Sequence, residues 1–538
     1  MRIHSLSRVI LGSLVLLALA PAGCGAQNDP GIEEASAPAA GAPLHWLIHG
    51  GQVLDGSGGP PRRADVLLSG DRIAHVGVVD PDTLEVDERF DATGLVVTPG
   101  FIDLHAHGDP VEGGEFRSFL AMGVTTITLG QDGSSTEAGS LSAWFDAVDG
   151  ARPRVNVATL VGHNTLRGES GVGFDPPSAE GSTRMAALVE IAMEAGAFGL
   201  STGLEYTPGN RADADELAAV AEPVARRNGV VMSHMRNEDH DRIEASVAEL
   251  LEQGRRSGAA VHASHLKIVL GSDTTLAHRV LGLMDEARVE GLRVTADLYP
   301  YTASFTGVSI LFPEWARPPN DYDRVVRERG DELASHLRAR VLSRNGPEAT
   351  LFGSGELDGF GPLGGHTLAR VADAVGRPFE EVLVALGPGG ARAAYFVMDE
   401  AVLAVFLRDP RVAVASDGSP TMSHPRGYGT FPRVIRHHVM EEGRLTLEEA
   451  VRRMSGLPAG ILGLDDPDRV ELPRGLLARG WGADLVVFDP ATLRDRADFQ
   501  NPHQLAEGMR RIWVNGRLAW TGSEPAPGPG HGRAIRRR

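Results

Sequence analysis

The chain has 538 residues, of which 42% are hydrophobic and 23% charged, so it carries enough apolar residues to bury a large core. Its formal net charge is −19 and its isoelectric point is about 5.5, which excludes the basic surface typical of non-specific nucleic-acid-binding proteins. A single cysteine, Cys24, excludes an intrachain disulfide.

The first residues carry the signals of an exported protein. Two arginines precede an apolar run at 9–20 that is short for a membrane span and typical of a signal peptide. The sequence Pro21-Ala22-Gly23-Cys24 then resembles a bacterial lipobox. We expect a signal peptide at 1–23, a lipid anchor on Cys24 in the periplasm or outer membrane, and a flexible tether at 24–44. Because proline is unusual at the first position of a lipobox, plain secretion is the alternative.

Short β-strands are expected at both ends of the folded region. Residues 45–98 alternate apolar and polar side chains between glycine turns, and residues 483–489 and 511–517 have the same character. Neither set forms a stable sheet alone, so we expect residues 45–98 and 458–523 to build one small β-sandwich. The tail at 524–538 is rich in proline and glycine and is expected to be disordered.

The central region alternates short apolar strands with helical stretches, which is typical of a parallel βα array. The expected strands are 95–104, 124–129, 155–161, 198–202, 230–235, 260–266, 293–298 and 411–415. The fold class is therefore α/β, and residues 99–457 are expected to form a (β/α)8 TIM-like barrel. Roughly a hundred residues separate the last two strands, far more than a usual βα loop. We expect this insertion, at 305–410, to act as a lid over the barrel mouth.

Polar side chains end each of these strands, where the active sites of βα barrels lie. In chain order they are His105, His107, Asp132, His163, Glu205, Tyr206, His234, His265, Lys267, Tyr299 and Asp417. Considered by themselves, His105 and His107 are as consistent with two unrelated histidines as with a pair of metal ligands. His163 considered by itself is interpreted as a solvated loop residue. Together, the imidazoles of His105, His107, His234 and His265 and the carboxylate of Asp417 predict a site for one or two divalent ions, best matched by zinc.

Lys267 is the only lysine among 52 basic residues. Its retention indicates a position where a compact ammonium serves and a guanidinium does not. Chance survival of one lysine codon is the alternative interpretation.

Most of these residues lie in short motifs spread along the chain. They are PGFIDLHAH at 99–107, GHNTLR at 162–167, GLEYTPG at 203–209, SHMR at 233–236, SHLK at 264–267, DLYPY at 297–301 and SDG at 416–418. The series resembles the amidohydrolase superfamily and, more closely, its N-acyl-D-amino-acid deacylase (D-aminoacylase) family. The resemblance covers nearly the whole chain after residue 45.

The resemblance implies a metal-ligand set and a set of substrate contacts. A tighter zinc position would be held by His234 and His265, and a weaker one by His105, His107 and Asp417. Asp417 would also act as general base and acid. The carboxylate of the substrate would be bound by Lys267, Tyr299, Ser304 and Arg426.

The turn after the second strand departs from the family pattern. Where the family typically has a metal-binding cysteine in a Gly-Asn-Cys-Gly-like turn, this chain has Gly130-Gln131-Asp132-Gly133. A carboxylate binds zinc but is a harder ligand than a thiolate. We therefore predict that Asp132 is a metal ligand, and that this exported protein avoids an oxidisable thiol at its site.

The expected reaction is metal-assisted hydrolysis of an N-acyl-D-amino acid to a carboxylate and a free D-amino acid, the D configuration being implied by the resemblance alone. Asp417 would accept the proton of water and pass it to the leaving amine, and His163 or Tyr206 would donate to the oxyanion. Within enzymes the alternatives are a cyclic-amide hydrolase, of hydantoinase or dihydroorotase type, and a D-dipeptidase. From another class, the alternative is a non-catalytic binding lipoprotein.

Overall fold

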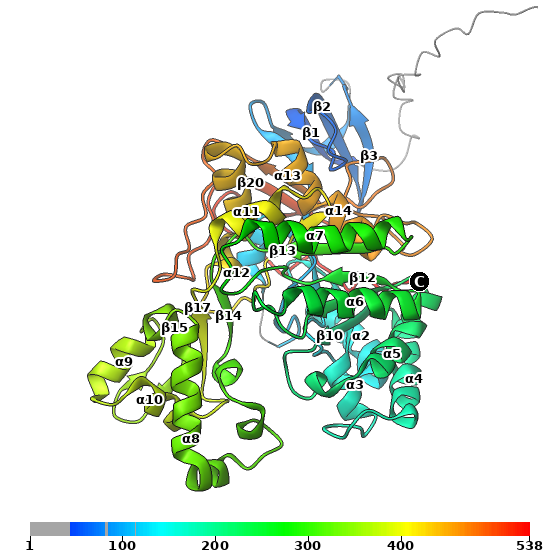
Figure 1. Cartoon of the computed structure of the whole chain (residues 1–538). Helices are drawn as coiled ribbons and strands as arrows, with labels where there is room; N and C mark the ends of the chain where they lie inside the picture. Colours follow the sequence, from blue (N-terminus) through cyan, green and yellow to red (C-terminus); the bar gives the residue numbers. More distant parts are fainter. Residues whose placement is uncertain (1–43, 81–83, 113–114) are drawn as a thin grey trace, which may run out of the picture. The chain divides into compact units, whose positions relative to one another are not determined.

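The computed structural model describes residues 44–80, 84–112 and 115–538 (Figure 1). The expected signal peptide, the cysteine of the lipobox and nearly all of the tether lie outside these residues. Among the residues described, no helix combines the length and the apolar character needed to cross a bilayer.

A parallel β-barrel of eight strands forms the centre of the chain and confirms the expected fold class. Its strands are β6 (Phe101–Asp103), β7 (Val124–Leu129), β8 (Asn156–Thr159) continued by β9 (Val161–Gly162), β10 (Gly199–Gly203), β11 (Val230–His234), β12 (Ala260–Ala263), β13 (Val294–Leu298) and β18 (Val412–Val414). Successive strands pair in parallel. A parallel bridge between Ala106 and Gly418 links the first strand to the eighth and closes the ring.

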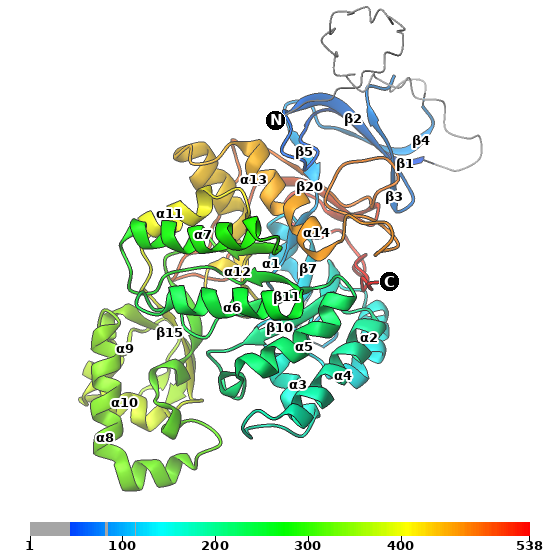
Figure 2. The same cartoon turned by 45° about the vertical axis from the view of Figure 1, so that its right-hand side comes forward.

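Helices follow the barrel strands in sequence and pack around them (Figure 2). They are α1 (Arg117–Ala121), α2 (Leu141–Ala151), α3 (His163–Glu169), α4 (Ala179–Ala195), α5 (Ala214–Arg226), α6 (Ile243–Ser257), α7 (Thr274–Val289), α11 (Glu400–Arg408), α12 (Arg426–Arg433), the π-helix Val434–Glu441, α13 (Leu447–Met454) and α14 (Gly456–Leu462). Side-chain caps begin several of them; Asp213, for example, accepts from the backbone N–H of Glu216 at the start of α5. Their apolar residues join the strands in one core, which leaves the carboxyl ends of the strands to polar loops.

Both ends of the chain contribute to one β domain, as expected, and their strands are connected in a single eight-stranded sheet. Its strands are β1 (Leu44–Val53), β2 (Arg62–Ser69), β3 (Arg72–Gly77), β4 (Val86–Asp91), β5 (Val96–Pro99), β19 (Leu485–Phe488), β20 (Met509–Val514) and β21 (Arg517–Trp520). The antiparallel pairing of Pro99 with Leu485 joins the two ends. The expected first barrel strand, 95–104, instead divides at Gly100 into β5 of this sheet and β6 of the barrel. A Cβ at Gly100 would lie 2.0 Å from Thr125 Oγ1, so only glycine fits at the division.

The insertion between β13 and α11 has a sheet and a core of its own. It contains β14 (Ser304–Gly307), α8 (Tyr322–Ser343), β15 (Thr350–Leu357), β16 (Gly361–Pro362), α9 (Leu368–Val375), α10 (Phe379–Leu386) and β17 (Ala391–Tyr395), with strand order β14-β17-β15-β16. Side chains of α8, α9 and α10 pack on this sheet in a separate apolar cluster. The insertion therefore ends before the expected residue 410, because α11 packs against the barrel helix α7 instead.

The structure differs from the expectation that the tail at 524–538 is disordered. The tail runs beside β8, where the Val157 N–H donates to Arg533 O at 2.9 Å and the Ile535 N–H donates to Val157 O at 2.8 Å. Ala534 and Ile535 are 7% exposed, and Arg536 pairs with Asp149 at 2.7 Å. Composition alone misled here because backbone pairing to a strand needs few apolar side chains.

Candidate metal centre

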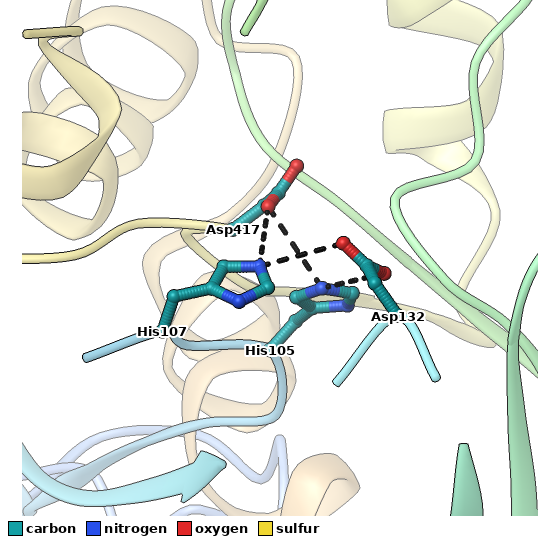
Figure 3. Close-up of side chains that lie close together, drawn as sticks. All are labelled: His105, His107, Asp132 and Asp417. Atoms are coloured by element: carbon teal, nitrogen blue, oxygen red, sulfur yellow. Dashed lines mark hydrogen bonds and ion pairs between the residues drawn. The ribbon is translucent and has the colours of Figure 1, made fainter. Parts of the chain in front are cut away.

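The first and eighth strands bring three predicted ligands together. The Asp417 N–H donates to His105 O at 2.8 Å, and the His107 N–H donates to Gly418 O at 2.7 Å, so the two strand ends are tied by their backbones. His107 Nε2 then lies 3.1 Å from Asp417 Oδ1, and His105 Nε2 lies 3.8 Å from the same oxygen. Figure 3 shows these side chains converging with Asp132.

The fifth and sixth strands supply a second group of ligand atoms. His234 Nδ1 lies 2.9 Å from His265 Nε2, so two imidazole nitrogens face each other. Asp132 Oδ1 lies 3.3 Å from His265 Nε2 and 3.7 Å from His234 Nδ1. This is the constellation expected of a metal position held by two histidines and a carboxylate.

Asp132 belongs to both groups. Its Oδ1 lies 3.2 Å from His105 Nε2, and its Oδ2 lies 3.5 Å from His107 Nε2. Groups of ligand atoms within 4.8 Å of one another form on either side of it, one with His105, His107 and Asp417 and the other with His234 and His265. Its carboxylate is thus placed to ligate both positions.

Two buried carboxylates fix the backbone beneath these ligands. Asp103 Oδ1 accepts from the backbone N–H groups of His105, at 3.2 Å, and Ser416, at 2.9 Å. Asp297 accepts from the backbone N–H of His265 at 2.6 Å and lies 2.8 Å from His262 Nε2. Each carboxylate therefore holds one strand end in a defined position beside its neighbour.

Three of these ligands have a strained backbone. Asp132, His265 and Asp417 have φ values of 54°, 38° and 48°, in the left-handed region that favours glycine. The Asp132 turn also packs on β10, where a Cβ at Gly203 would lie 2.1 Å from Asp132 O. Strained non-glycine residues held in place by their surroundings are typical of functional sites.

The electrostatics of the centre favour a cation. Burial opposes ionisation of Asp132, but His105, His234 and His265 together outweigh that effect and lower the pKa of this carboxyl well below its usual value. Burial likewise disfavours a charge on His234, yet its contacts with Asp132 and Glu205 raise the pKa of its imidazole to about 10. The field that favours a proton on this imidazole also favours a divalent ion among the same groups.

The burial of His105 also supports metal binding by these side chains. Both ring nitrogens of His105 are buried without a hydrogen bond in the described structure, and the side chain is 0% exposed. A buried imidazole with no hydrogen bond is costly unless a metal or another group satisfies it. Nitrogen and carboxylate oxygen ligands of this kind suit zinc.

A polar cavity of about 920 Å³ opens over the centre. The loops at the carboxyl ends of the barrel strands, here called the barrel rim, line it together with residues of the insertion. The predicted site residues that line it are His107, Asp132, Tyr206, His234, His265, Lys267, Tyr299, Ser304, Asp417 and Arg426. His105 lies below, fully buried.

His163 does not line this cavity. Its Nε2 lies 2.8 Å from Glu216 Oε1, with both side chains 0% exposed, and Arg167 pairs with the same carboxylate. The prediction that His163 contacts substrate is therefore not supported by its position. The third strand ends at the start of α3, which turns this imidazole towards α5 rather than into the cavity.

Lys267 is held by a carboxylate that the sequence reasoning missed. Its Nζ lies 2.6 Å from Glu238 Oε1 and 2.8 Å from His265 Nδ1. Glu238 Oε1 also lies 3.1 Å from His265 Nδ1, the ring nitrogen opposite the metal centre. Glu238 lies in the loop after β11, four residues after His234. Its closeness in sequence to a predicted ligand is the feature that could have identified it as a site residue.

The remaining predicted substrate contacts surround one aromatic ring. Arg426 lies 4.7 Å from the centre of the Tyr299 ring, and Lys267 Nζ lies 5.8 Å from it. Arg426 also pairs with Asp417 Oδ2 at 2.9 Å. Ser304 lies at the start of β14, on the wall contributed by the insertion.

Comparison with known proteins agrees with this geometry. The chain is 36% identical over 521 residues to N-acyl-D-glutamate deacylase of Alcaligenes xylosoxydans xylosoxydans, covering 92% of this chain and 97% of the relative. It is 34% identical to D-aminoacylase of the same organism over 89% of this chain and 95% of the relative. The chain belongs to the N-acyl-D-amino-acid deacylase family. The sequence model of the amidohydrolase family matches residues 360–519.

Solved structures of this deacylase family share the fold and contain metal. The crystal structure of N-acyl-D-glutamate deacylase from Bordetella bronchiseptica, with zinc and a phosphonate inhibitor, matches with a TM-score of 0.78 and 33% identity over 92% of this chain and all of that chain. A D-aminoacylase structure addressing its binuclear metal centre matches with a TM-score of 0.77 and 31% identity over the same shares. Family and geometry together identify the centre as a zinc site.

Proposed function

We propose that the protein is a zinc-dependent amidohydrolase that hydrolyses N-acyl-D-amino acids to a carboxylate and a free D-amino acid. The observation that carries the proposal is the convergence of four imidazoles with Asp132 and Asp417 at the floor of one polar cavity. Family membership supplies the linear amide and the D configuration.

The chain's own residues divide the work of amide hydrolysis. His105, His107, His234, His265, Asp132 and Asp417 would hold one or two zinc ions. Bound zinc would polarise the scissile carbonyl and acidify water. Asp417 takes the proton from the attacking water and returns it to the leaving nitrogen. Burial disfavours its charge, but Arg426 and the neighbouring histidines keep its pKa below the usual value, so this carboxylate is ionised and able to accept a proton.

Other side chains position the substrate. Lys267 and Arg426, both close to the Tyr299 ring, provide positive charge for the α-carboxylate, and Tyr299 provides a hydroxyl. The Tyr206 ring packs against the His234 ring, with the ring centres 4.5 Å apart and the planes tilted by 41°. Burial and the Asp132 carboxylate raise the pKa of Tyr206 well above its usual value, so its hydroxyl stays protonated. It can therefore donate a hydrogen bond to the developing oxyanion.

The test is turnover of paired enantiomers by the zinc-loaded protein. N-acetyl-D-methionine and N-acetyl-L-methionine are compared, with a hydantoin as the cyclic-amide control, before and after chelation and reloading with zinc. We expect hydrolysis of the D compound only, lost on chelation and restored by zinc. Preference for the L compound, or turnover of the hydantoin alone, would contradict the proposal.

We also propose that the protein is exported and anchored by a lipid on Cys24, on the strength of its apolar run and lipobox-like sequence. The test is incorporation of labelled palmitate by the full chain and by Cys24→Ser in a bacterial host. Labelling of the wild type alone is expected. Equal absence of label in both, with processed protein in the medium, would show plain secretion instead.

A further inference from the structure

The cavity over the zinc site is lined by four cationic side chains, and three of them are paired with acidic groups of the same cavity. Lys267 lies 2.6 Å from Glu238, Arg344 lies 3.1 Å from Asp239, and Arg426 lies 2.9 Å from Asp417. The fourth cation is Arg392. Among the described residues it forms neither an ion pair nor a side-chain hydrogen bond, and its side chain is exposed.

Arg392 lies on the wall that the insertion contributes. It is in β17, where its backbone is opposite Gly307 of β14 and Ser354 of β15, and both of these neighbours also line the cavity. Its guanidinium lies 5.6 Å from the centre of the Phe305 ring, a cation–π contact that leaves its hydrogen-bond donors unused.

The same wall contacts the catalytic floor through β14. Thr306 Oγ1 lies 3.2 Å from the hydroxyl of Tyr206, and Arg426 donates to Phe305 O at 3.3 Å. Arg392 is therefore one strand away from residues that contact the reacting region. The cavity volume of about 920 Å³ is at the upper end of the range for small-molecule sites, so it has room for a group beyond the amide and its α-carboxylate.

We propose that Arg392 binds a second anionic group of the substrate, so that the preferred substrates are N-acyl-D-amino acids with two negative charges. The inference rests on the proposed function, because Lys267, Tyr299 and Arg426 are assigned there to the α-carboxylate. This guanidinium, without an ion pair in the described part of the chain, offers a planar pair of donors suited to a carboxylate.

The second carboxylate can belong to the amino-acid side chain or to the far end of the acyl group. Two pairs of substrates of nearly equal shape distinguish these two positions of the second carboxylate. N-acetyl-D-glutamate against N-acetyl-D-glutamine tests the side chain, and N-succinyl-D-alanine against N-succinamoyl-D-alanine tests the acyl group. Each pair differs by one negative charge at nearly constant size.

The experiment measures kcat/KM for both pairs with the zinc-loaded wild type, Arg392→Met, Arg392→Lys and the control Arg377→Met. Arg377 is an exposed arginine of the same insertion that does not line the cavity. In at least one pair, we expect the kcat/KM of the wild type to be about tenfold or more higher for the substrate with the second carboxylate than for its amide counterpart. A hydrogen bond to a charged group is strong enough for an effect of this size. Arg392→Met should remove most of that preference, Arg392→Lys should retain part of it, and Arg377→Met should keep it.

Two results would overturn the inference: similar kcat/KM values within both pairs for the wild type, or a preference that survives Arg392→Met. Failure of the proposed function looks different, because then neither the dianionic nor the monoanionic D substrates are hydrolysed. Metal content measured for each variant distinguishes a loss of zinc from a loss of substrate contact.

Discussion

The barrel rim and the insertion contribute to one cavity in different ways. The rim gathers side chains from strand ends more than 300 residues apart in sequence, and these groups are buried and in contact with one another, as with His105 and Asp417. The insertion folds around its own apolar cluster and presents Arg392, which has no ion-pair partner among the described residues, to the cavity. We therefore propose that the rim carries the hydrolytic chemistry and binds the α-carboxylate, and that the insertion adds a preference among substrates.

This division predicts separable effects of substitution. Changes in the rim should lower activity on every substrate or remove zinc, whereas changes in the insertion should leave the zinc in place. The two regions are in contact through the Tyr206–Thr306 and Arg426–Phe305 hydrogen bonds. If a substitution in one region changes the other, we expect the change to pass through these contacts.

The largest effect is expected for Asp417→Asn. Removing the group that takes and returns the proton should lower kcat by roughly 100- to 10,000-fold on all substrates, the range usual for a general acid–base residue. The measurement is steady-state turnover on N-acetyl-D-methionine together with zinc content. An Asp417→Asn protein that keeps kcat near the wild-type value would show that another group moves the proton.

Asp132→Ala should remove the carboxylate that both ligand groups share. We expect zinc affinity to fall by more than about 100-fold, because a direct ligand should matter at least as much as the outer partners of ligands do. Competition with a zinc-binding dye measures this without reference to activity. Unchanged zinc binding would remove Asp132 from the ligand set.

Leu337→Ala should affect the insertion and spare the rim. Leu337 is fully buried in the core of the insertion, and truncation of such a leucine costs about 2–5 kcal/mol of stability. Calorimetry of the variant should show a lower unfolding temperature, while zinc per chain stays at the wild-type value. Loss of zinc in this variant would show that the two regions are not separable.

Glu238→Gln should act through its neighbours. The glutamate contacts Nδ1 of His265 and Nζ of Lys267, so it orients a ligand and an assigned substrate contact together. Loss of an outer partner of this kind typically weakens metal binding by about 10- to 100-fold. We expect weaker zinc binding and a raised KM. A change in kcat alone, with zinc affinity intact, would contradict this positioning role.

The smallest effect concerns His438, a buried histidine outside the rim. Burial, with His437 and Arg444 nearby, lowers the pKa of His438 to about 3. The unfolded chain takes up a proton here near pH 6.5 and the folded chain does not, so this contribution to stability is present above pH 6.5 and is lost as pH falls towards 3.

His438→Asn should therefore flatten the pH dependence of unfolding. Between pH 6.5 and 5, the free energy of unfolding of the wild type should fall more steeply than that of the variant, by up to about 1.4 kcal/mol per pH unit. Urea titrations at both pH values measure the difference. Equal slopes for the two proteins would mean that His438 is protonated in the folded state.

Much of the rim could be predicted from the sequence because parallel strands place their carboxyl ends on one edge. This rule predicts His105, His107, His234, His265 and Asp417 as ligands, whereas Asp132 is predicted from the turn that departs from the family pattern. The same rule placed His163 in the cavity, where the immediate start of α3 turns it into a buried pair with Glu216. Strand position fixes where a side chain begins, whereas the local turn decides which way it points.

The insertion and the tail could not be predicted to the same depth. Arg392 reaches the cavity through the pairing of β17 with β14 and β15, which joins residues far apart in sequence and leaves no local pattern. The tail packs by backbone hydrogen bonds to β8, which composition does not reveal. Glu238 lies in an irregular loop, where no periodicity marks the residues that turn inward.

An anomalous-diffraction map of zinc-loaded crystals tests the metal centre most directly. We predict zinc between Asp132 and the ring nitrogens of His234 and His265, with ligand distances of about 2.0–2.2 Å, and a second, weaker peak beside His105, His107 and Asp417. A map with no peak at Asp132, and zinc only at the separate cluster of Glu400, His437, His438 and Glu442, would contradict this prediction.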